Sequence, residues 1–132
     1  MRETKRNMKK NNIKKLGFTL VEIMIVVAII GLLAAIAIPN FVKARTTSQQ
    51  NACINNLRLV DASKQQWALE QKKQTSDSPV GTDLQPYLGR GANGELPVCP
   101  VDPQNTFATS YTPNNVGTSP QCNILGATHV LP

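Results

Sequence analysis

Gly17-Phe18-Thr19-Leu20-Val21-Glu22 is the stretch that decides the fold, because it joins a basic leader to a long apolar run. The run extends from Phe18 to Ile38 and would be about 32 Å long as a helix, against about 30 Å for the hydrocarbon core of a bilayer. Glu22 lies inside this run, and a carboxylate near the centre of a membrane helix costs about 2.5–3.5 kcal/mol, less near an end. We therefore interpret Glu22 as a functional group that needs a cationic partner.

The bases of the leader account for the whole net charge of the chain, which is +6. Residues 1–17 contain one acid, Glu3, and the bases Arg2, Lys5, Arg6, Lys9, Lys10, Lys14 and Lys15. Acids and bases balance from Phe18 onward, so net charge gives no support for nucleic-acid binding by the rest of the chain. Lys and Arg beside a span stay cytoplasmic, so we expect the C-terminal part to lie outside the inner membrane. Met1 and Met8 both remain possible starts.

The basic leader, Gly17, the five residues that follow it and Pro39 resemble the class III signal of type IV pilins and type II secretion pseudopilins. The resemblance extends from Lys14 to about Arg45. It implies that a prepilin peptidase cleaves after Gly17 and methylates the new amine of Phe18. It also implies that Glu22 pairs with the N-terminus of a neighbouring subunit in a helical filament. An ordinary secretory signal is the alternative, but the apolar run exceeds the usual ~7–15 residues and that alternative leaves Glu22 unexplained.

Helical character continues beyond the apolar run, since residues 40–74 contain no Gly or Pro. One apolar stripe at helical spacing follows this segment, formed by Cys53, Leu57, Val60, Trp67 and Ala68. Lys64 interrupts the stripe and is expected to extend its amine to solvent. We predict one helix from Phe18 to about Lys73, with a transmembrane half, 18–38, and an amphipathic half, 39–74.

Gly31 and Pro39 mark the place where this helix is expected to bend or unwind. Proline lacks an amide hydrogen and crowds the carbonyl four residues earlier, which costs about 3 kcal/mol in a straight helix. The resemblance implies that the stretch between the two residues loses helicity when subunits pack into a filament.

The remaining residues, 75–132, are rich in Pro and Gly and predict a small β-rich head. Candidate strands are residues 96–99, 106–112 and either 121–125 or 127–131, and Thr82-Asp83-Leu84-Gln85 fits a helical capping box. So small a sheet must pack on the apolar stripe to complete a core. The predicted fold is α+β, a long N-terminal helix against a small antiparallel sheet, similar to the ladle of pilins.

Three cysteines in an exported chain permit one disulfide and leave one thiol. Cys99 and Cys122 are the expected pair, because both lie in the loop-rich head, and closing that loop contributes about 3.5 kcal/mol in the chain-entropy model. The resemblance agrees, since many pilins close a C-terminal loop this way. Cys53 is expected to be a small buried hydrophobe, with another pairing or an exposed thiol left open.

No motif predicts catalysis, and we expect neither an enzyme nor a cofactor. His129 is the only histidine, and no nucleophile elbow, haem motif or paired-histidine zinc motif accompanies it. No metal site is predicted. The oxygen donors Asp83, Glu95 and Asp102 lack EF-hand spacing and are interpreted as solvated loop residues, although the sequence leaves calcium binding open.

The function predicted from these features is that of a structural subunit in a homo-oligomeric helical filament. The resemblance implies assembly by an inner-membrane platform and its ATPase, with no nucleic acid as a partner. The subunit would cross the inner membrane once, with its head in the periplasm, before it joins a periplasmic or extracellular filament. The alternative is a minor pilin that acts as a membrane-anchored binding module for DNA or a surface. The sequence leaves open whether the filament is a pilus or a pseudopilus, and whether the subunit is major or minor.

Overall fold

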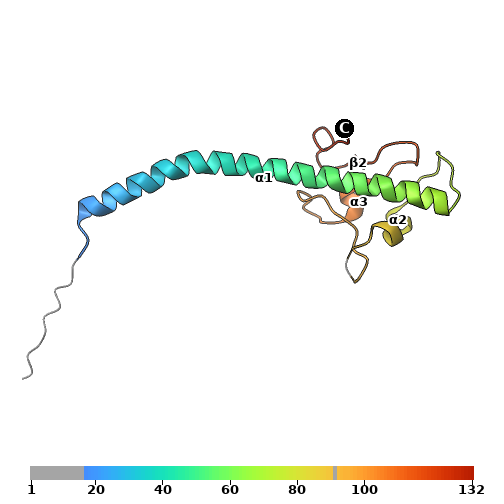
Figure 1. The fold of residues 1–132 in the computed structure, drawn as a ribbon, viewed down its shortest axis with the longest axis horizontal. Helices are drawn as coiled ribbons and strands as arrows, with labels where there is room; N and C mark the ends of the chain where they lie inside the picture. Colours follow the sequence, from blue (N-terminus) through green and yellow to red (C-terminus); the bar gives the residue numbers. More distant parts are fainter. Residues whose placement is uncertain (1–16, 91) are drawn as a thin grey trace, which may run out of the picture. The chain divides into compact units, whose positions relative to one another are not determined.

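The computed structural model describes residues 17–90 and 92–132, so most of the predicted leader lies outside the described residues. The elements are, in order, α1 (Leu20–Glu70), α2 (Gly81–Leu88), α3 (Phe107–Ser110), β1 (Tyr111–Thr112) and β2 (Gln121–Cys122) (Figure 1). The chain divides into two compact units, an N-terminal unit that ends at Pro39 and a C-terminal unit from Asn40 to Pro132. α1 begins in the first unit and ends in the second.

The predicted long helix is confirmed as α1, which has 51 residues and somewhat narrower bounds than expected. Its C-terminal end falls at Glu70 because the backbone reverses shortly afterwards. Lys72 has a φ of 53°, and the Lys73 amide donates to the Ala68 carbonyl at 2.9 Å. This is the hydrogen bond of a Schellman motif, which stops a helix and satisfies one of its last carbonyls.

The sheet of the C-terminal unit is smaller than the sequence predicts. β1 and β2 pair antiparallel in the register Tyr111↔Cys122 and Thr112↔Gln121. Pro113 follows β1 directly and Pro120 precedes β2, and neither has an amide hydrogen to extend the ladder. Together with the long helix, this pair confirms the α+β fold.

The strand predictions are confirmed only in part, because β1 lies at the end of the predicted segment 106–112 and β2 at the start of the alternative 121–125. Residues 96–99 and 127–131 form no strand, and residues 107–110 form α3. A side-chain cap explains why residues 107–110 form a helix. The Thr106 hydroxyl oxygen accepts a hydrogen bond from the Thr109 amide at 3.3 Å and starts the helical turn.

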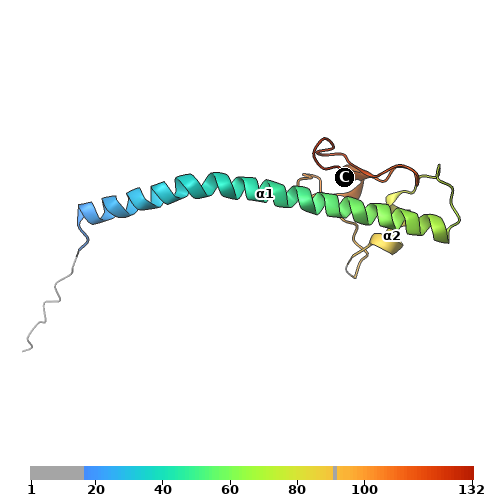
Figure 2. The ribbon, with the colours of Figure 1, turned by 45° about the horizontal axis from the view of Figure 1, so that its top comes forward.

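The core of the C-terminal unit forms on the predicted apolar stripe of α1. All five stripe residues are buried: Cys53, Leu57, Val60, Trp67 and Ala68. They pack with buried residues of the following segments: Leu84, Leu88, Cys99, Phe107, Tyr111, Val116 and Cys122. The segments around α2 and β2 flank α1 in both ribbon views (Figures 1 and 2). The helix therefore supplies the larger surface against which two short strands can be held.

Lys64 departs from expectation, because its amine does not extend to solvent. The side chain is fully buried, and its Nζ donates to the carbonyl oxygens of Pro113, at 3.0 Å, and Thr118. Asp61, one turn earlier in α1, has its Oδ1 3.3 Å from the same Nζ. The prediction was wrong because the loop between β1 and β2 brings its own acceptors to the amine, which removes the need for water.

α2 begins earlier than the predicted capping box, which placed the cap at Thr82. The cap is Val80, which has no side-chain acceptor, and Asp83 completes the contact instead. The Asp83 carboxylate accepts from the Val80 amide at 3.0 Å, in the manner of the acid at the third position of a helix. Asp83 is therefore engaged inside the chain rather than left as a solvated loop residue.

Candidate functional site

The N-terminal unit presents an apolar helical surface with nothing packed on it among the described residues. Phe18, Leu20, Val21 and Ile23 are exposed, and so are the further large apolar side chains up to Ile38. α1 contains a segment that is long and apolar enough to cross a membrane, by its length and composition. An exposed apolar surface of this extent is unfavourable in water, so it indicates contact with lipid, with other chains, or with each in turn.

The start of α1 is closed by two reciprocal hydrogen bonds between Thr19 and Glu22. The Glu22 amide donates to Thr19 Oγ1 at 3.2 Å, and the Thr19 amide donates weakly to Glu22 Oε2 at 3.5 Å. This is a capping box, and Glu22 also lies in the first turn, where the helix dipole favours an anion. Sequence reasoning missed this role, although the spacing of a threonine and a glutamate three residues later is its usual signal.

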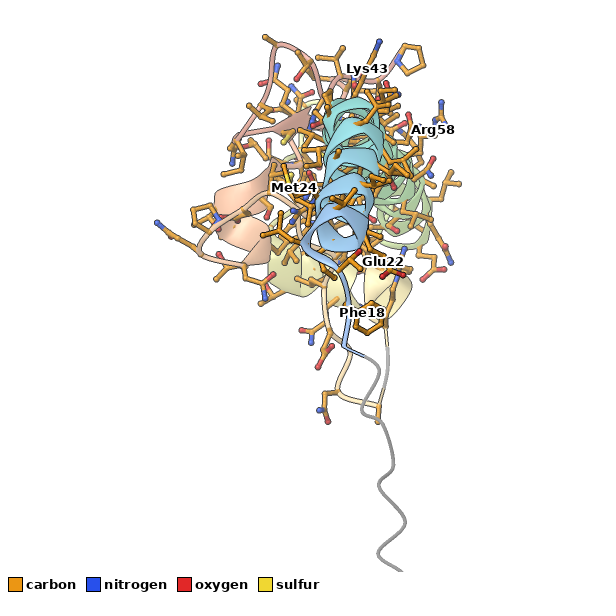
Figure 3. All side chains as sticks on the ribbon, turned by 90° about the vertical axis from the view of Figure 1, so that its left-hand side faces the viewer. Phe18, Glu22, Met24, Lys43 and Arg58 are labelled. Atoms are coloured by element: carbon orange, nitrogen blue, oxygen red, sulfur yellow. The ribbon has the colours of Figure 1, made fainter. Side chains whose placement is uncertain are left out.

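Gly17 and Phe18 precede the helix and are open to solvent. Both are exposed and neither belongs to a regular element. A Cβ added at Gly17 would meet nothing within 4 Å. Seen along α1 in Figure 3, the side chains of Phe18 and Glu22 project on the same side of the chain. The backbone between Gly17 and Phe18 is thus accessible. The Glu22 carboxylate lies on the same side of the chain as Phe18, which would carry the new amine after cleavage.

Gly31 and Pro39 both lie within α1, which continues through them in the single chain. A Cβ at Gly31 would also meet nothing within 4 Å, so the glycine is not required by a neighbour in the described structure. The boundary between the two compact units falls immediately after Pro39. Loss of helicity between the two residues on filament formation stays a prediction.

The two cysteines of the predicted disulfide are adjacent in the C-terminal unit. Cys99 Sγ and Cys122 Sγ lie 3.9 Å apart as separate thiols, and both side chains are buried. Cys53 is fully buried, as expected, and Tyr111 donates its hydroxyl hydrogen to Cys53 Sγ at 3.6 Å. Burial raises the pKa of the Cys53 and Cys99 thiols. The Cys99–Cys122 disulfide stays a prediction.

Asp102, one of the scattered oxygen donors, is held by hydrogen bonds within the chain. Its carboxylate accepts from the Thr109 hydroxyl at 2.6 Å, the Ser110 hydroxyl at 2.7 Å and the Gln104 amide at 2.9 Å. The hydroxyl hydrogen bonds from Thr109 and Ser110 lower the pKa of Asp102 to about 2. These bonds organise the loop around α3 and occupy oxygens that a calcium ion would need.

The match to a known family model lies in the N-terminal part of the chain. A family model described as a prokaryotic N-terminal methylation motif matches residues 13–38. The type IV major pilin protein PilA of Myxococcus xanthus is 57% identical over 49 residues, which are 37% of this chain and 22% of PilA. A fimbrial protein of Pseudomonas aeruginosa is 40% identical over 73 residues, 55% of this chain and 47% of that protein. The chain thus spans less than half the length of each of these two relatives.

The match to competence protein ComGC of Bacillus subtilis covers more of the relative. The two chains are 38% identical over 86 residues, which are 64% of this chain and 80% of ComGC. None of the relatives named here is named as an enzyme, which supports a function without catalysis. No solved structure matches the chain.

Proposed function

Because the chain belongs to the family of type IV pilins and pseudopilins, we propose that it is a structural subunit of a pilus-like or secretion filament. The observation that carries the proposal is the exposed apolar surface of α1 with one carboxylate, Glu22, at its start. Before assembly the lipid bilayer covers this surface, and in the filament the equivalent surfaces of neighbouring subunits cover it. The relatives do not favour the alternative of a membrane-anchored binding module.

Processing makes the subunit competent for assembly. A prepilin peptidase cuts between Gly17 and Phe18 and methylates the amine of Phe18, and the exposure of both residues supports access. The basic leader keeps the N-terminal side in the cytoplasm, so the C-terminal unit lies in the periplasm until the subunit is extracted. An inner-membrane platform and its ATPase then add the subunit to a filament of identical chains.

We expect the mature protein to begin at methylated Phe18. Cleavage there removes every base of the leader and leaves the Glu22 carboxylate about one helical turn from the new amine. Expression with and without a prepilin peptidase, followed by intact-mass measurement and N-terminal sequencing, tests this expectation. Signal peptidase prefers a small-x-small sequence such as Ala35-Ile36-Ala37 and would produce a chain beginning at Ile38. That chain, or an unprocessed chain in the presence of the prepilin peptidase, contradicts the expectation.

The filament itself is the direct test of the function. Coexpression with a prepilin peptidase and an assembly platform should yield fibres that shear from the cells and contain the processed chain, visible by electron microscopy. A Gly17→Leu variant is the matched control, because it blocks cleavage and leaves α1 unchanged. Processed subunit that stays in the membrane as single chains, in cells that assemble a related pilin, would overturn the proposed function.

A further inference from the structure

Four buried side chains of the C-terminal unit converge on one point. They are Cys53 from α1, Cys99 from the segment before α3, Cys122 from β2 and His129 from the C-terminal segment. The three Sγ atoms and one imidazole nitrogen all lie within 4.8 Å of one another. The group forms only on folding, because the residues are far apart in the sequence.

The three distances among Cys99, Cys122 and His129 are close to those of a tetrahedral metal site. His129 Nδ1 lies 3.9 Å from Cys99 Sγ and 3.9 Å from Cys122 Sγ, and the two sulfurs are also 3.9 Å apart. Zinc bonds of about 2.3 Å to sulfur and about 2.0–2.1 Å to nitrogen place tetrahedral ligands roughly 3.5–3.8 Å from one another. A disulfide instead requires the sulfurs to approach to about 2.05 Å.

All four groups are almost fully shielded from water. Exposed fractions are 0% for Cys53, 1% for Cys99, 3% for Cys122 and 3% for His129. A neutral imidazole is the commonest metal ligand among side chains. Thiolates in the same place need a positive charge beside them, and a divalent cation provides it.

A second layer of hydrogen bonds holds the ligands in place. Tyr111 donates its hydroxyl hydrogen to Cys53 Sγ, and Asn56 donates to the same hydroxyl oxygen at 3.1 Å. The Cys99 amide donates to Ser110 Oγ at 2.9 Å, and Ser110 donates in turn to Asp102. Partners of this kind orient the ligands of a metal site and tune its affinity.

We propose that Cys53, Cys99, Cys122 and His129 bind one Zn²⁺ as a closed structural site that ties three segments of the C-terminal unit to α1. Three thiolates and an imidazole are the ligand set of structural zinc and are unsuited to calcium or magnesium. The two short strands provide little cohesion, and a metal linking α1, the segment before α3, β2 and the C-terminal segment supplies it. Binding releases the thiol protons to solvent, so it is coupled to folding and to pH.

The predicted Cys99–Cys122 disulfide is the competing state, because it would consume two of the four ligands. The zinc proposal rests only on residues of the C-terminal unit. It is independent of the proposed filament function and can fail while that function stands.

The first experiment measures metal and thiols in the intact protein. The full chain, without a histidine tag, is purified in detergent without chelator, and zinc is determined by elemental mass spectrometry alongside intact mass. We expect about one Zn²⁺ per chain and a mass with all three thiols reduced. Cobalt exchanged for zinc should give the visible bands of tetrahedral Co²⁺ with a thiolate charge-transfer band. A zinc-free chain, whether its thiols are free or it has lost two hydrogens to a Cys99–Cys122 disulfide, overturns the proposal.

Variants outside the predicted disulfide identify the ligands. Cys53→Ser and His129→Ala should each weaken zinc binding by at least about tenfold, since even changes to second-layer partners commonly cost about that much. His129→Cys should keep a tetrahedral site and shift the cobalt spectrum. Val60→Ala, a buried change on the same stripe, is the control and should retain zinc. If Cys53→Ser and His129→Ala both hold zinc as the parent does, the ligand set is wrong. The metal content and cobalt spectrum of the parent decide the matter even if a variant fails to fold.

Discussion

Glu22→Gln is expected to stop filament assembly while the subunit remains in the membrane, cleaved and folded. Glutamine can replace glutamate in the capping box with Thr19, so the start of α1 is preserved. What the substitution removes is the negative charge that would meet the amine of Phe18 on a neighbouring subunit. This attraction is much stronger in a low-dielectric environment than in water. The Phe18 amine left without its carboxylate partner would be an unpaired buried charge, which is strongly destabilising.

The expected loss of assembled filament is at least about tenfold, because a net change of about 1.4 kcal/mol at each docking step is a tenfold change in that equilibrium. Glu22→Ala removes the charge and the cap together and should assemble no better than Glu22→Gln. Glu22→Asp keeps the charge on a shorter arm and should retain partial assembly. The measurement compares processed subunit in the membrane with filament sheared from the cells.

Thr19→Val is the matched control for the cap. It removes the hydroxyl that accepts from the Glu22 amide and leaves the carboxylate in place, so assembly should persist once cleavage has been verified. The opposite pattern, in which Glu22→Gln assembles like the parent and Thr19→Val does not, would assign Glu22 to helix capping alone. The intersubunit ion pair would then have to be abandoned.

Hydrophobic pattern predicted the large features of this fold and failed on the small ones. The apolar stripe from Cys53 to Ala68 is read directly from helical spacing, and all of it is buried. Residues 106–112 have strand-forming side chains, yet residues 107–110 form α3, because the side chain of Thr106 caps a turn there. Such local hydrogen bonds compete with strand formation and leave little trace in hydrophobic pattern.

One of the two candidate sites could be predicted from the sequence and the other could not. The chemistry around Glu22 is contained in contiguous residues, so the sequence was sufficient to propose it. The Cys53, Cys99, Cys122 and His129 group has no motif spacing, because each ligand comes from a different segment. The number of cysteines and the position of two of them in the loop-rich head therefore predict one disulfide, and no sequence motif connects His129 with the cysteines. The convergence of the four side chains depends on how the loops pack on α1.

Lys64→Met is expected to lower the free energy of unfolding of the C-terminal unit by about 1–3 kcal/mol. The buried amine of Lys64 donates to the carbonyls of half-buried Pro113 and of Thr118, and a carbonyl that is shielded from water after its donor is removed costs about 1–3 kcal/mol. Methionine keeps most of the buried side-chain volume, so the cost comes from the lost hydrogen bonds. Part of it is offset, because the variant no longer buries an ammonium group whose pKa is already lowered by burial.

Denaturant unfolding of the full chain in detergent, at a fixed zinc concentration, measures the effect of Lys64→Met. Trp67 is the only tryptophan and is buried in the core of the C-terminal unit, so its fluorescence reports that unit. Lys43→Met makes the same chemical change at an exposed position of α1 and should shift stability by less than about 0.5 kcal/mol. The adjacent loop contact, from Gln65 Nε2 to the Val116 carbonyl at 3.0 Å, remains in both variants. A Lys64→Met chain as stable as the parent would mean that water or a shifted loop satisfies the two carbonyls, and that the buried amine does not hold this loop on the helix.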